Sequence, residues 1–245
     1  MSGVFVPLTA QGLSLHAVLD LASLPADVQA SLALTPQERA RYRQLILIGH
    51  QGRGFWQALQ ARGWHGSDPV DTFVGECIQA WMNGPLAGHA WVQVFPGPRP
   101  VGLQRLGELA GWHHPSPFWV GVDAEWGSWF AYRAVVLADT DLPLTLRRTL
   151  PSPCLDCSGQ PCVAACPAQA LSPIGAQGVD TRPPAAAGLR ACVEYRLQPG
   201  SVCQDRCLAR TACPVGAVHR YDDPQVAYHY LQSLPAIRAW KANAP

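Results

Sequence analysis

The sequence has few charges and no long apolar run. Charged residues make up 14% of its 245 residues, and 18 basic side chains face 17 acidic ones, which leaves a formal net charge of +1. A charge so close to zero provides no bulk field that would recruit nucleic acid or an anionic membrane. No stretch approaches the roughly 18 consecutive apolar residues that a membrane-spanning helix needs. We therefore expect neither nucleic acid nor a membrane as a partner.

Cysteine is scarce in most of the chain and concentrated near its end. Of the nine cysteines, Cys77 is the only one in the first 150 residues, and the other eight lie between Cys154 and Cys213. A disulfide framework would require a secreted protein. Residues 1–12 have no basic residue before their apolar stretch, which argues against a secretory signal and favours a cytoplasmic location. Clustered cysteines in such a chain indicate metal binding.

The first 150 residues carry the patterns of an α/β domain. Thr35, followed by Pro36 and Glu38, is typical of a helix start with a capping box. Short apolar runs predict strands, and apolar side chains at helical spacing predict helices. We expect strands at 44–48, 91–95, 119–122 and 129–138, helices at 36–42, 55–62, 71–82 and 101–110, and either type at 13–21.

The composition changes after a proline-containing linker. Residues 142–153 contain three prolines, which end regular structure, and from Cys154 onwards the chain is rich in cysteine, proline and glycine. This change predicts two domains, residues 1–150 and residues 151–245. We expect the second to be rich in loops and to close with an amphipathic helix over 225–242.

Most of the clustered cysteines form two groups that each end in Cys-Pro. The groups read Cys154-x2-Cys157-x4-Cys162-x3-Cys166-Pro167 and Cys203-x3-Cys207-x5-Cys213-Pro214, with Cys192 ahead of the second. A last cysteine followed by proline is characteristic of bacterial ferredoxins, in which that cysteine ligates the other of two iron–sulfur clusters. The eight cysteines suffice for two [4Fe–4S] clusters, with none to spare.

The ferredoxin pattern divides these cysteines into two sets of four. The first set is Cys154, Cys157, Cys162 and Cys213; the second set is Cys166, Cys192, Cys203 and Cys207. Three spacings, 157–162, 203–207 and 207–213, are looser than in the ferredoxin run, and each fits a small loop insertion. Two structural zinc sites are the alternative, although zinc does not require Cys-Pro at the end of both groups.

The arrangement of the cysteines resembles that of known redox families. A lone cysteine, Cys192 in LRACVEYR, between two ferredoxin-type groups looks like the pattern of epoxyqueuosine reductases and reductive dehalogenases. The segment 108–111 followed by Gly127-Ser128-Trp129-Phe130 is also similar to epoxyqueuosine reductase. That resemblance implies a nitroreductase-like α/β domain that binds cobalamin, followed by a ferredoxin-like module with two [4Fe–4S] clusters.

A second resemblance concerns the candidate cofactor site. The stretch GSWFAYRAVVLAD resembles the cobalamin-processing protein MMACHC, whose matching strand carries an arginine at the position of Arg133. The two resemblances together imply a cofactor-binding group in the first domain. Its members are Gly127, Ser128, Trp129, Phe130 and Arg133.

The sequence also departs from epoxyqueuosine reductases. Those enzymes place an aspartate proton donor just before the helix that ends at an Ala-Gly pair, where this sequence reads Phe95-Pro96-Gly97-Pro98. The resemblance does not extend to the C-terminal helical-repeat domain that helps those enzymes hold tRNA. With a near-neutral charge and no basic stripe, we do not expect epoxyqueuosine reduction.

Several other residues have both a functional and a structural interpretation. Trp129 and Arg133 lie four residues apart on an expected strand, so their side chains would point the same way toward a cofactor. The alternative is that Trp129 is a core residue and Arg133 a surface residue.

His113 and His114 could bind metal, but adjacent histidines in an extended chain face opposite ways, which favours a loop role. The glycine-rich segment 49–54 could meet a phosphate or simply turn the chain. Cys77 is most simply a buried thiol.

These observations lead to one expected function and two alternatives. We expect an iron–sulfur electron-transfer protein that passes single electrons through two [4Fe–4S] clusters to a cofactor at the domain junction, namely a corrinoid such as cobalamin. Its electrons would come from a donor protein or a small reductant. The alternatives are a ferredoxin-type carrier without a corrinoid and a flavin-dependent reductase, since nitroreductase-like folds hold FMN. Whether the chain is itself an enzyme stays open.

Overall fold

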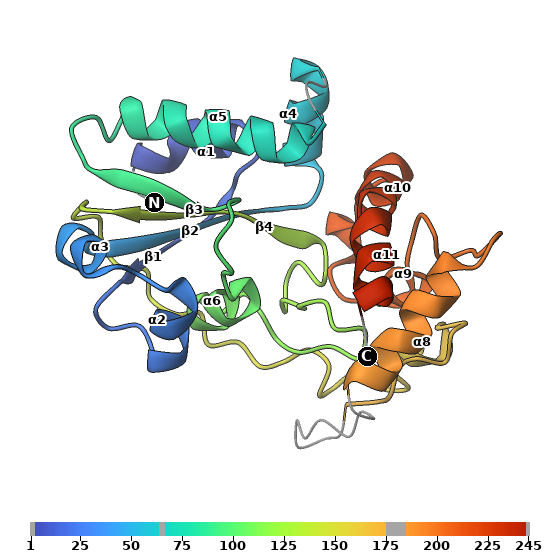
Figure 1. Cartoon of the computed structure of the whole chain (residues 1–245). Helices are drawn as coiled ribbons and strands as arrows, with labels where there is room; N and C mark the ends of the chain where they lie inside the picture. The colour runs from blue at the N-terminus through green and yellow to red at the C-terminus, as the bar shows by residue number, and fades with distance from the viewer. Residues whose placement is uncertain (1–2, 64–66, 175–184, 244–245) are drawn as a thin grey trace. The chain divides into compact units, whose positions relative to one another are not determined.

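The chain folds into two compact units. The computed structural model describes residues 3–63, 67–174 and 185–243 (Figure 1). The first unit comprises residues up to His113 together with Phe130–Thr149. The second comprises His114–Trp129 and the residues from Leu150 onwards. The segment 114–129 therefore belongs to the cysteine-containing unit, although it precedes the last strand of the first one.

The first unit is built on a small antiparallel sheet with the strand order β1-β2-β4-β3. Its strands are β1 (Leu15–Asp20), β2 (Gln44–Gln51), β3 (Trp91–Phe95) and β4 (Phe130–Ala138). The four residues Leu45–Ile48 in β2 and the five residues Ala134–Ala138 in β4 are each 0% exposed. Such continuous apolar runs mark strands that are buried on both faces. The mixed α/β class expected from the sequence is confirmed.

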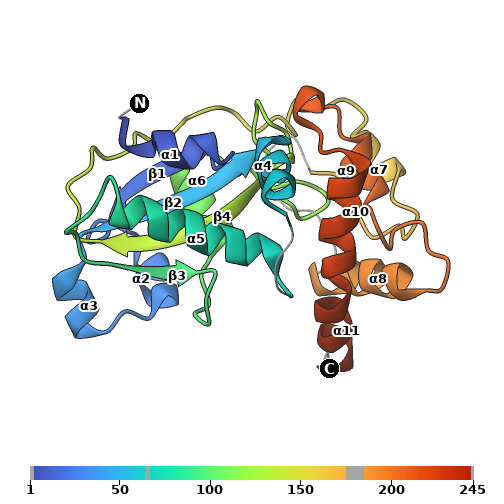
Figure 2. The ribbon, with the colours of Figure 1, turned by 90° about the horizontal axis from the view of Figure 1, so that it is seen from above.

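Helices cover both faces of this sheet, with α1, α4 and α5 on one side and α2 and α6 on the other (Figures 1 and 2). The helices are α1 (Val6–Ala10), α2 (Ala26–Leu32), α3 (Pro36–Arg41), α4 (Gly54–Arg62), α5 (Pro69–Asn83) and α6 (Leu103–Ala110), preceded by the 3-10 turn η1 (Gly3–Phe5).

The capping box predicted at the start of α3 is confirmed: the Thr35 side chain accepts from the Glu38 amide, and the Glu38 side chain accepts from the Thr35 amide.

Short helices and loops make up the second unit. Its elements are α7 (Pro161–Ala164), α8 (Ala185–Leu197), α9 (Leu208–Ala212), η2 (Ala217–His219), α10 (Asp223–Gln232) and α11 (Leu234–Asn243). Within the part of the chain that the structure describes, its β pairing consists of the isolated bridges His114–Val122 and Asp123–Gly127. None of the described helices is long and apolar enough to cross a membrane.

Two secondary-structure predictions for this unit are wrong. The strand expected at 119–122 does not form, because Trp119 has a positive φ of 60° and so interrupts an extended backbone. The single helix expected over 225–242 is two helices, α10 and α11, which meet at Ser233. Pro235, which follows this junction, has no N–H to donate to the carbonyl of Leu231, so the helix cannot run through it.

Candidate functional site

The second unit holds eight of the nine cysteines, and all of them are free thiols. Cys162 lies in α7, Cys192 lies in α8, and Cys207 is the N-cap residue of α9. The remaining five lie in turns and loops. Cys154, Cys162, Cys203 and Cys213 are buried, and the other four are half-buried. Short turns of this kind can aim several thiols at one point from different directions.

The thiols of the first set interact with one another. Burial is the main cause that raises the pKa of Cys154 to about 12, and the charges of Cys213, Cys162 and Cys157 contribute to the same rise. Burial likewise raises the pKa of Cys162 to about 11, with contributions from Cys213 and Cys157. These four residues, separated by up to 59 positions in the sequence, therefore lie within electrostatic reach of one another.

The second set shows the same behaviour. Burial raises the pKa of Cys192 to about 11; the charges of Cys207, Cys166 and Cys203 act in the same direction, and the charge of Arg196 opposes them. Burial also raises the pKa of Cys203, with further contributions from Cys207 and Cys166. Five of the eight cysteines have a shifted pKa. For each of them, every cysteine named as a cause of the shift belongs to the same set.

The donor chemistry of each set suits an iron–sulfur cluster. Four thiolates are the ligands that a [4Fe–4S] cube takes, one for each iron. Among the described residues, no group of three or more His, Cys, Asp or Glu side chains is placed to hold a single metal ion. Ligands of a cube bind separate irons and so stand farther apart than the ligands of one ion. The residues present therefore fit the group.

Apolar side chains surround the first set. Cys162 and Cys213 are 6% exposed and pack in one cluster with Phe118, Val122 and Ala209. Two of these partners come from the segment 114–129, which explains why that segment folds with the second unit. An apolar shell excludes water and lowers the local dielectric, and both effects tune the reduction potential of a bound cluster.

Three of the expected cofactor-binding residues have contacts within the second unit. Gly127 has a φ of 60°, and a Cβ at this position would lie 2.0 Å from the carbonyl oxygen of Val215. Glycine is thus required here because two backbone segments meet, one of which directly follows Cys213. Ser128 is fully buried and accepts a hydrogen bond from Nε of Arg210 at 3.2 Å.

Trp129 lies outside the strand on which the sequence placed it, because β4 begins at Phe130. Its ring is 1% exposed and meets the ring of Tyr221 edge-on, with centroids 5.4 Å apart. The guanidinium of Arg210 lies 4.5 Å from the centroid of the Trp129 ring. The expectation that Trp129 and Arg133 point the same way from one strand is therefore wrong, and Trp129 is a core residue of the second unit.

Arg133 and Phe130 lie in β4 of the first unit. Arg133 is half-buried and its Nε donates to Nδ1 of His50 at 3.0 Å. Its guanidinium lies 5.1 Å from the centroid of the Phe55 ring, and His50 stacks on the same ring at 4.7 Å. The interpretation of Arg133 as a plain surface residue does not hold. Phe130 is 6% exposed and meets the Tyr132 ring edge-on at 5.6 Å.

His50 is the residue of this group that the sequence did not single out. The segment 49–54 drew attention for its glycines, whereas the structure continues β2 through Gln51 and buries the His50 ring completely. Asp71, near the start of α5, lies close to the same group: burial raises its pKa, as does the charge of Asp68, and the charge of Arg133 lowers it. The sequence signal that could have identified His50 is a histidine within a run of apolar strand residues.

The remaining candidates have structural roles. The Nδ1 atom of His113 is 3.1 Å from the hydroxyl of Tyr132, whereas the backbone of His114 pairs with Val122. The two histidines thus have different contacts, which favours a loop role over a shared metal site. Cys77 is 7% exposed, and burial raises the pKa of its thiol to about 11, as expected for a buried structural cysteine.

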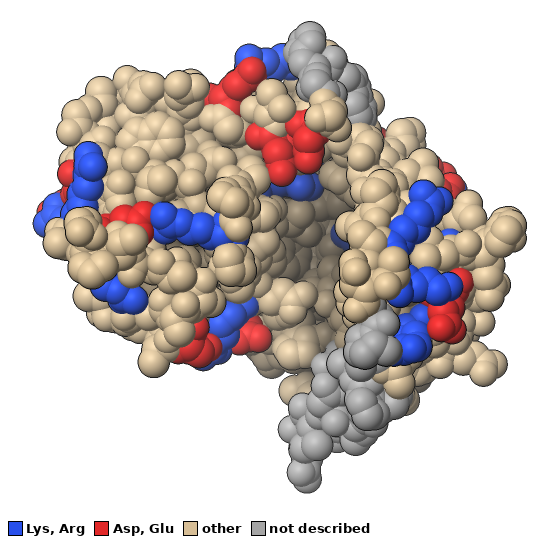
Figure 3. All heavy atoms as spheres, viewed as in Figure 1, with Lys and Arg blue, Asp and Glu red and all other residues tan. Residues whose placement is uncertain are grey.

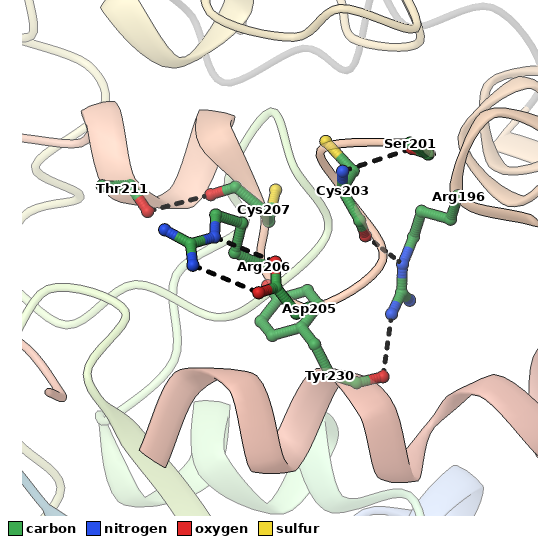
Figure 4. A network of polar contacts seen from close by, with 8 residues as sticks. All are labelled: Arg196, Ser201, Cys203, Asp205, Arg206, Cys207, Thr211 and Tyr230. Atoms are coloured by element: carbon green, nitrogen blue, oxygen red, sulfur yellow. Dashed lines mark hydrogen bonds and ion pairs between the residues drawn. The ribbon is translucent and has the colours of Figure 1, made fainter. Parts of the chain in front are cut away.

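Charges are interspersed on the surface. On the face drawn in Figure 3, arginines and acidic side chains lie next to one another, and neither sign forms a continuous patch. Near the second set, for example, Arg206 donates to Asp205 at 2.9 Å and 3.1 Å (Figure 4). This pairing neutralises two charges in the loop between Cys203 and Cys207.

No family model matches the sequence, and no curated protein matches it. Solved structures of epoxyqueuosine reductases match its fold. The structure from Streptococcus thermophilus has a TM-score of 0.54 at 12% identity, covering 87% of this chain and 65% of that one. The structure from Bacillus subtilis, with its catalytic loop swung out of the active site, has a TM-score of 0.55 at 13% identity. That match covers 90% of this chain and 66% of the Bacillus subtilis chain. An epoxyqueuosine reductase structure with an epoxyqueuosine-modified tRNA stem loop has a TM-score of 0.57 at 13% identity. That match covers 91% of this chain and 67% of the reductase chain.

These comparisons establish the fold and its extent. The chain shares a mixed α/β architecture with epoxyqueuosine reductases and spans about two thirds of their length, 65% in the Streptococcus thermophilus case. At identities of 12–13% the likeness concerns the arrangement of the backbone. The chemistry must be argued from the residues of this chain.

Proposed function

We propose that the protein is an iron–sulfur electron-transfer protein with two [4Fe–4S] clusters, one held by the first set of cysteines and one by the second. The observation that carries the proposal is the division of eight thiols into two groups of four that interact within each group. Each cluster, when bound, would supply a carrier of single electrons. The same proposal includes a ferredoxin-like second unit and a cytoplasmic, reducing location for the protein.

The chain's own residues provide the surroundings that such a role requires. Phe118 and Val122 exclude water around the first set. The backbone amide of Arg210 lies 3.5 Å from Sγ of Cys207, so it can donate a hydrogen bond to a thiolate of the second set. Hydrogen bonds to sulfur and exclusion of water are two of the means by which proteins adjust cluster potentials.

The first unit would hold the electron acceptor. By the resemblance to cobalamin-binding reductases, we propose a nitroreductase-like unit that binds a corrinoid, with Phe130 and Arg133 in the binding site. The bond between Arg133 and the buried His50 supports this, because it fixes a cationic side chain on a rigid strand. A flavin in place of the corrinoid is the alternative for this unit.

Titration of the anaerobically purified protein with cob(II)alamin, followed by EPR and visible absorption, tests the acceptor. We expect bound iron and a perturbed cobalt signal, and we expect Arg133→Ala to weaken the response. Arg39→Ala removes an exposed arginine of the same unit and should leave the response unchanged. Bound iron with no cobalt response would overturn the corrinoid assignment, and a released yellow chromophore would identify a flavin.

Reduction of epoxyqueuosine in tRNA is a second candidate function. It is favoured by the structural neighbours, one of which holds a tRNA stem loop, against the expectation of no nucleic-acid partner drawn from the net charge. Against it stands the sequence of the loop after β3, Phe95-Pro96-Gly97-Pro98, which has no carboxylate to donate a proton. Incubation of the reduced protein with epoxyqueuosine-containing tRNA, followed by nucleoside mass spectrometry, decides: queuosine formation would establish this activity, and unchanged substrate would exclude it.

A further inference from the structure

The surface of the first unit contains a hollow beside the turn between β1 and α2. Its volume is about 500 Å³, which is within the range of small-molecule sites. The lining residues are Asp20, Leu21, Ala22, Gln29, Arg39, Tyr42 and Arg43. They come from the end of β1, from α2 and α3, and from the residues just before β2. Helices α2 and α3 lie at the end of the sheet away from α4 (Figures 1 and 2).

Part of this lining is apolar and fixed. Leu21 is 6% exposed and Tyr42 is 7% exposed, so both side chains are anchored in the core of the first unit. The guanidinium of Arg41 lies 5.8 Å from the centroid of the Tyr42 ring and adds a positive charge near the hollow. Sites for small molecules typically combine such preformed apolar surface with a few polar groups.

Hydrogen bonds hold the polar side chains of the lining in place. Nε2 of Gln29 donates to the carbonyl oxygen of Leu24 at 2.8 Å, and Oε1 of Gln29 accepts from Nη1 of Arg39 at 3.0 Å. Nη2 of Arg43 donates to the carbonyl oxygen of Asp139 at 3.0 Å. Each guanidinium is thus positioned by one neutral acceptor, and a guanidinium has five N–H groups in all.

The two arginines of the lining have no carboxylate partner among the residues that the structure describes. The carboxylate of Asp20 also lines the hollow, but it accepts from the Ser23 hydroxyl and from a backbone amide of the turn. The carboxylate of Asp139 pairs with a histidine. The lining therefore has two cations, Arg39 and Arg43, against one carboxylate that already has hydrogen-bond donors.

A second, smaller hollow shares Asp20 and Arg43 with the first one. Its volume is about 200 Å³, and its lining adds a further carboxylate, that of Asp141. Carboxylates repel an anion, whereas Arg39 adds a second cation to the first hollow alone. An anion is therefore favoured in the first hollow.

The first hollow is separate from the site proposed for the electron acceptor. Arg43 lies just before β2, whereas His50, the partner of Arg133, is near the other end of that strand. A strand rises by roughly 3.3 Å per residue, so these two positions are on the order of 20 Å apart. A ligand in the hollow would not compete with the acceptor.

We propose that this hollow binds a small organic anion. Arg39 and Arg43 hold its phosphate or carboxylate group, and its apolar body lies against Leu21 and Tyr42. The fork of a guanidinium matches two oxygens of such a group, which makes arginine suited to recognising oxyanions. This inference goes beyond the proposed function and does not depend on the clusters.

Isothermal titration calorimetry of the anaerobically purified protein tests the proposal. Adenosine monophosphate and benzoate are the probes, because they join a flat apolar body to a phosphate and to a carboxylate, respectively. We expect saturable binding to one site, and the tighter probe identifies the preferred group. Adenosine lacks the charge and inorganic phosphate lacks the body, so both should bind at least about tenfold more weakly than adenosine monophosphate.

Substitutions then locate the bound probe. Arg39→Gln and Arg43→Gln should each weaken binding of the tighter probe about tenfold, because each removes a charge-assisted hydrogen bond. Arg43→Lys keeps the charge and should weaken binding less than Arg43→Gln. Arg62→Gln is the matched control: Arg62 is an exposed arginine of α4 that does not line the hollow, and its loss should leave binding unchanged.

Two results would overturn the proposal. One is the absence of saturable binding of both probes at millimolar concentrations. The other is binding that both glutamine variants retain at wild-type affinity, because the ligand would then lie elsewhere. Arg39 and Arg43 are exposed, so these variants should unfold at the same urea concentration as wild type, and a loss of binding then reports on the hollow itself.

Discussion

The nine thiols differ in their neighbours more than in their burial. Burial raises the pKa of Cys77 and of Cys192 to about 11 in both cases. The charged neighbours of Cys77 are Arg62 and Glu76, whereas those of Cys192 are three other cysteines and an arginine. A thiol among thiols is arranged for a cluster, and a thiol in an apolar helix face is arranged for packing.

Substitution of one cysteine of each kind should separate these roles. We expect Cys192→Ser to lower the iron content from about eight to about four per chain, because it removes one ligand of a [4Fe–4S] cluster. Cys77→Ser should leave the iron content unchanged. Iron and sulfide assays on anaerobically purified protein provide the measurement, and equal iron in both variants would show that Cys192 ligates nothing.

The sequence predicted the cysteine groups but not the arginines and the histidine around the candidate sites. Cysteine spacing is local information, and together with the ferredoxin pattern it predicts both sets of four. The contact of Arg210 with Ser128 joins residues 82 positions apart, and that of Arg133 with His50 joins residues 83 apart. Such contacts depend on which strands and loops meet, and spacing along the chain does not contain that information.

At the scale of single elements, α3 shows how one side chain can serve two purposes. Glu38 closes the capping box with Thr35 and also accepts from Arg99, which follows β3. The hydrogen bond from Arg99 is the main reason that the pKa of Glu38 is lowered to about 2, with the amide of Thr35 second. The local part was predictable from the sequence, and the tertiary ion pair was not.

This carboxylate should make stability depend on pH. Because its folded-state pKa is depressed, its contribution is present above its ordinary value of 4.5 and is lost as the pH falls toward 2. The Glu38 side chain is partly exposed and solvent screens its ion pair, so we expect an effect of about 1 kcal/mol or less. Urea unfolding between pH 6 and 3 should show a flatter profile for Glu38→Gln than for wild type. Glu76→Gln, which disrupts a half-exposed ion pair with Arg62, is the control, and an identical flattening there would contradict the assignment.

Two glycines offer a matched comparison between elements. Gly127 has a φ of 60° and faces the Val215 carbonyl, whereas Gly75 lies in α5 with nothing within 4 Å of its Cβ position. We expect Gly127→Ala to destabilise the second unit by more than about 1 kcal/mol and to reduce cluster retention. Gly75→Ala should stabilise the first unit by up to about 1 kcal/mol, because alanine favours a helix. Urea unfolding measures both, and a neutral Gly127→Ala would refute the close approach.

Considered as a whole, the molecule combines two units with different sources of stability. The first unit has an extensive apolar core around the sheet, in which Leu45–Ile48 and Ala134–Ala138 are fully buried. The second is assembled from short helices, with ligand candidates such as Cys162 and Cys213 among its core residues. The mixed α/β class was predictable because strands and helices have distinct periods. The boundaries of the units were less accessible, because the segment 114–129 leaves its sequence neighbours to pack against Cys162 and Cys213.

Removal of iron should therefore affect the two units differently. After oxidative cluster loss and chelation, we expect backbone amides of α7 and α9 to exchange at least tenfold faster, since ligands that organise the second unit are lost. Amides of β2 and β4 should keep their protection. Hydrogen–deuterium exchange with mass spectrometry measures both, and uniform acceleration across the chain would contradict the independence of the first unit's core.

The central claim is that the two sets of cysteines hold two iron–sulfur clusters, and the most direct test is the metal and sulfide content of the anaerobically purified protein. The account predicts about eight irons and about eight inorganic sulfides per chain, because each [4Fe–4S] cube contains four of each. Zinc bound without sulfide would contradict it, since the same thiols would then hold structural ions and could not carry electrons.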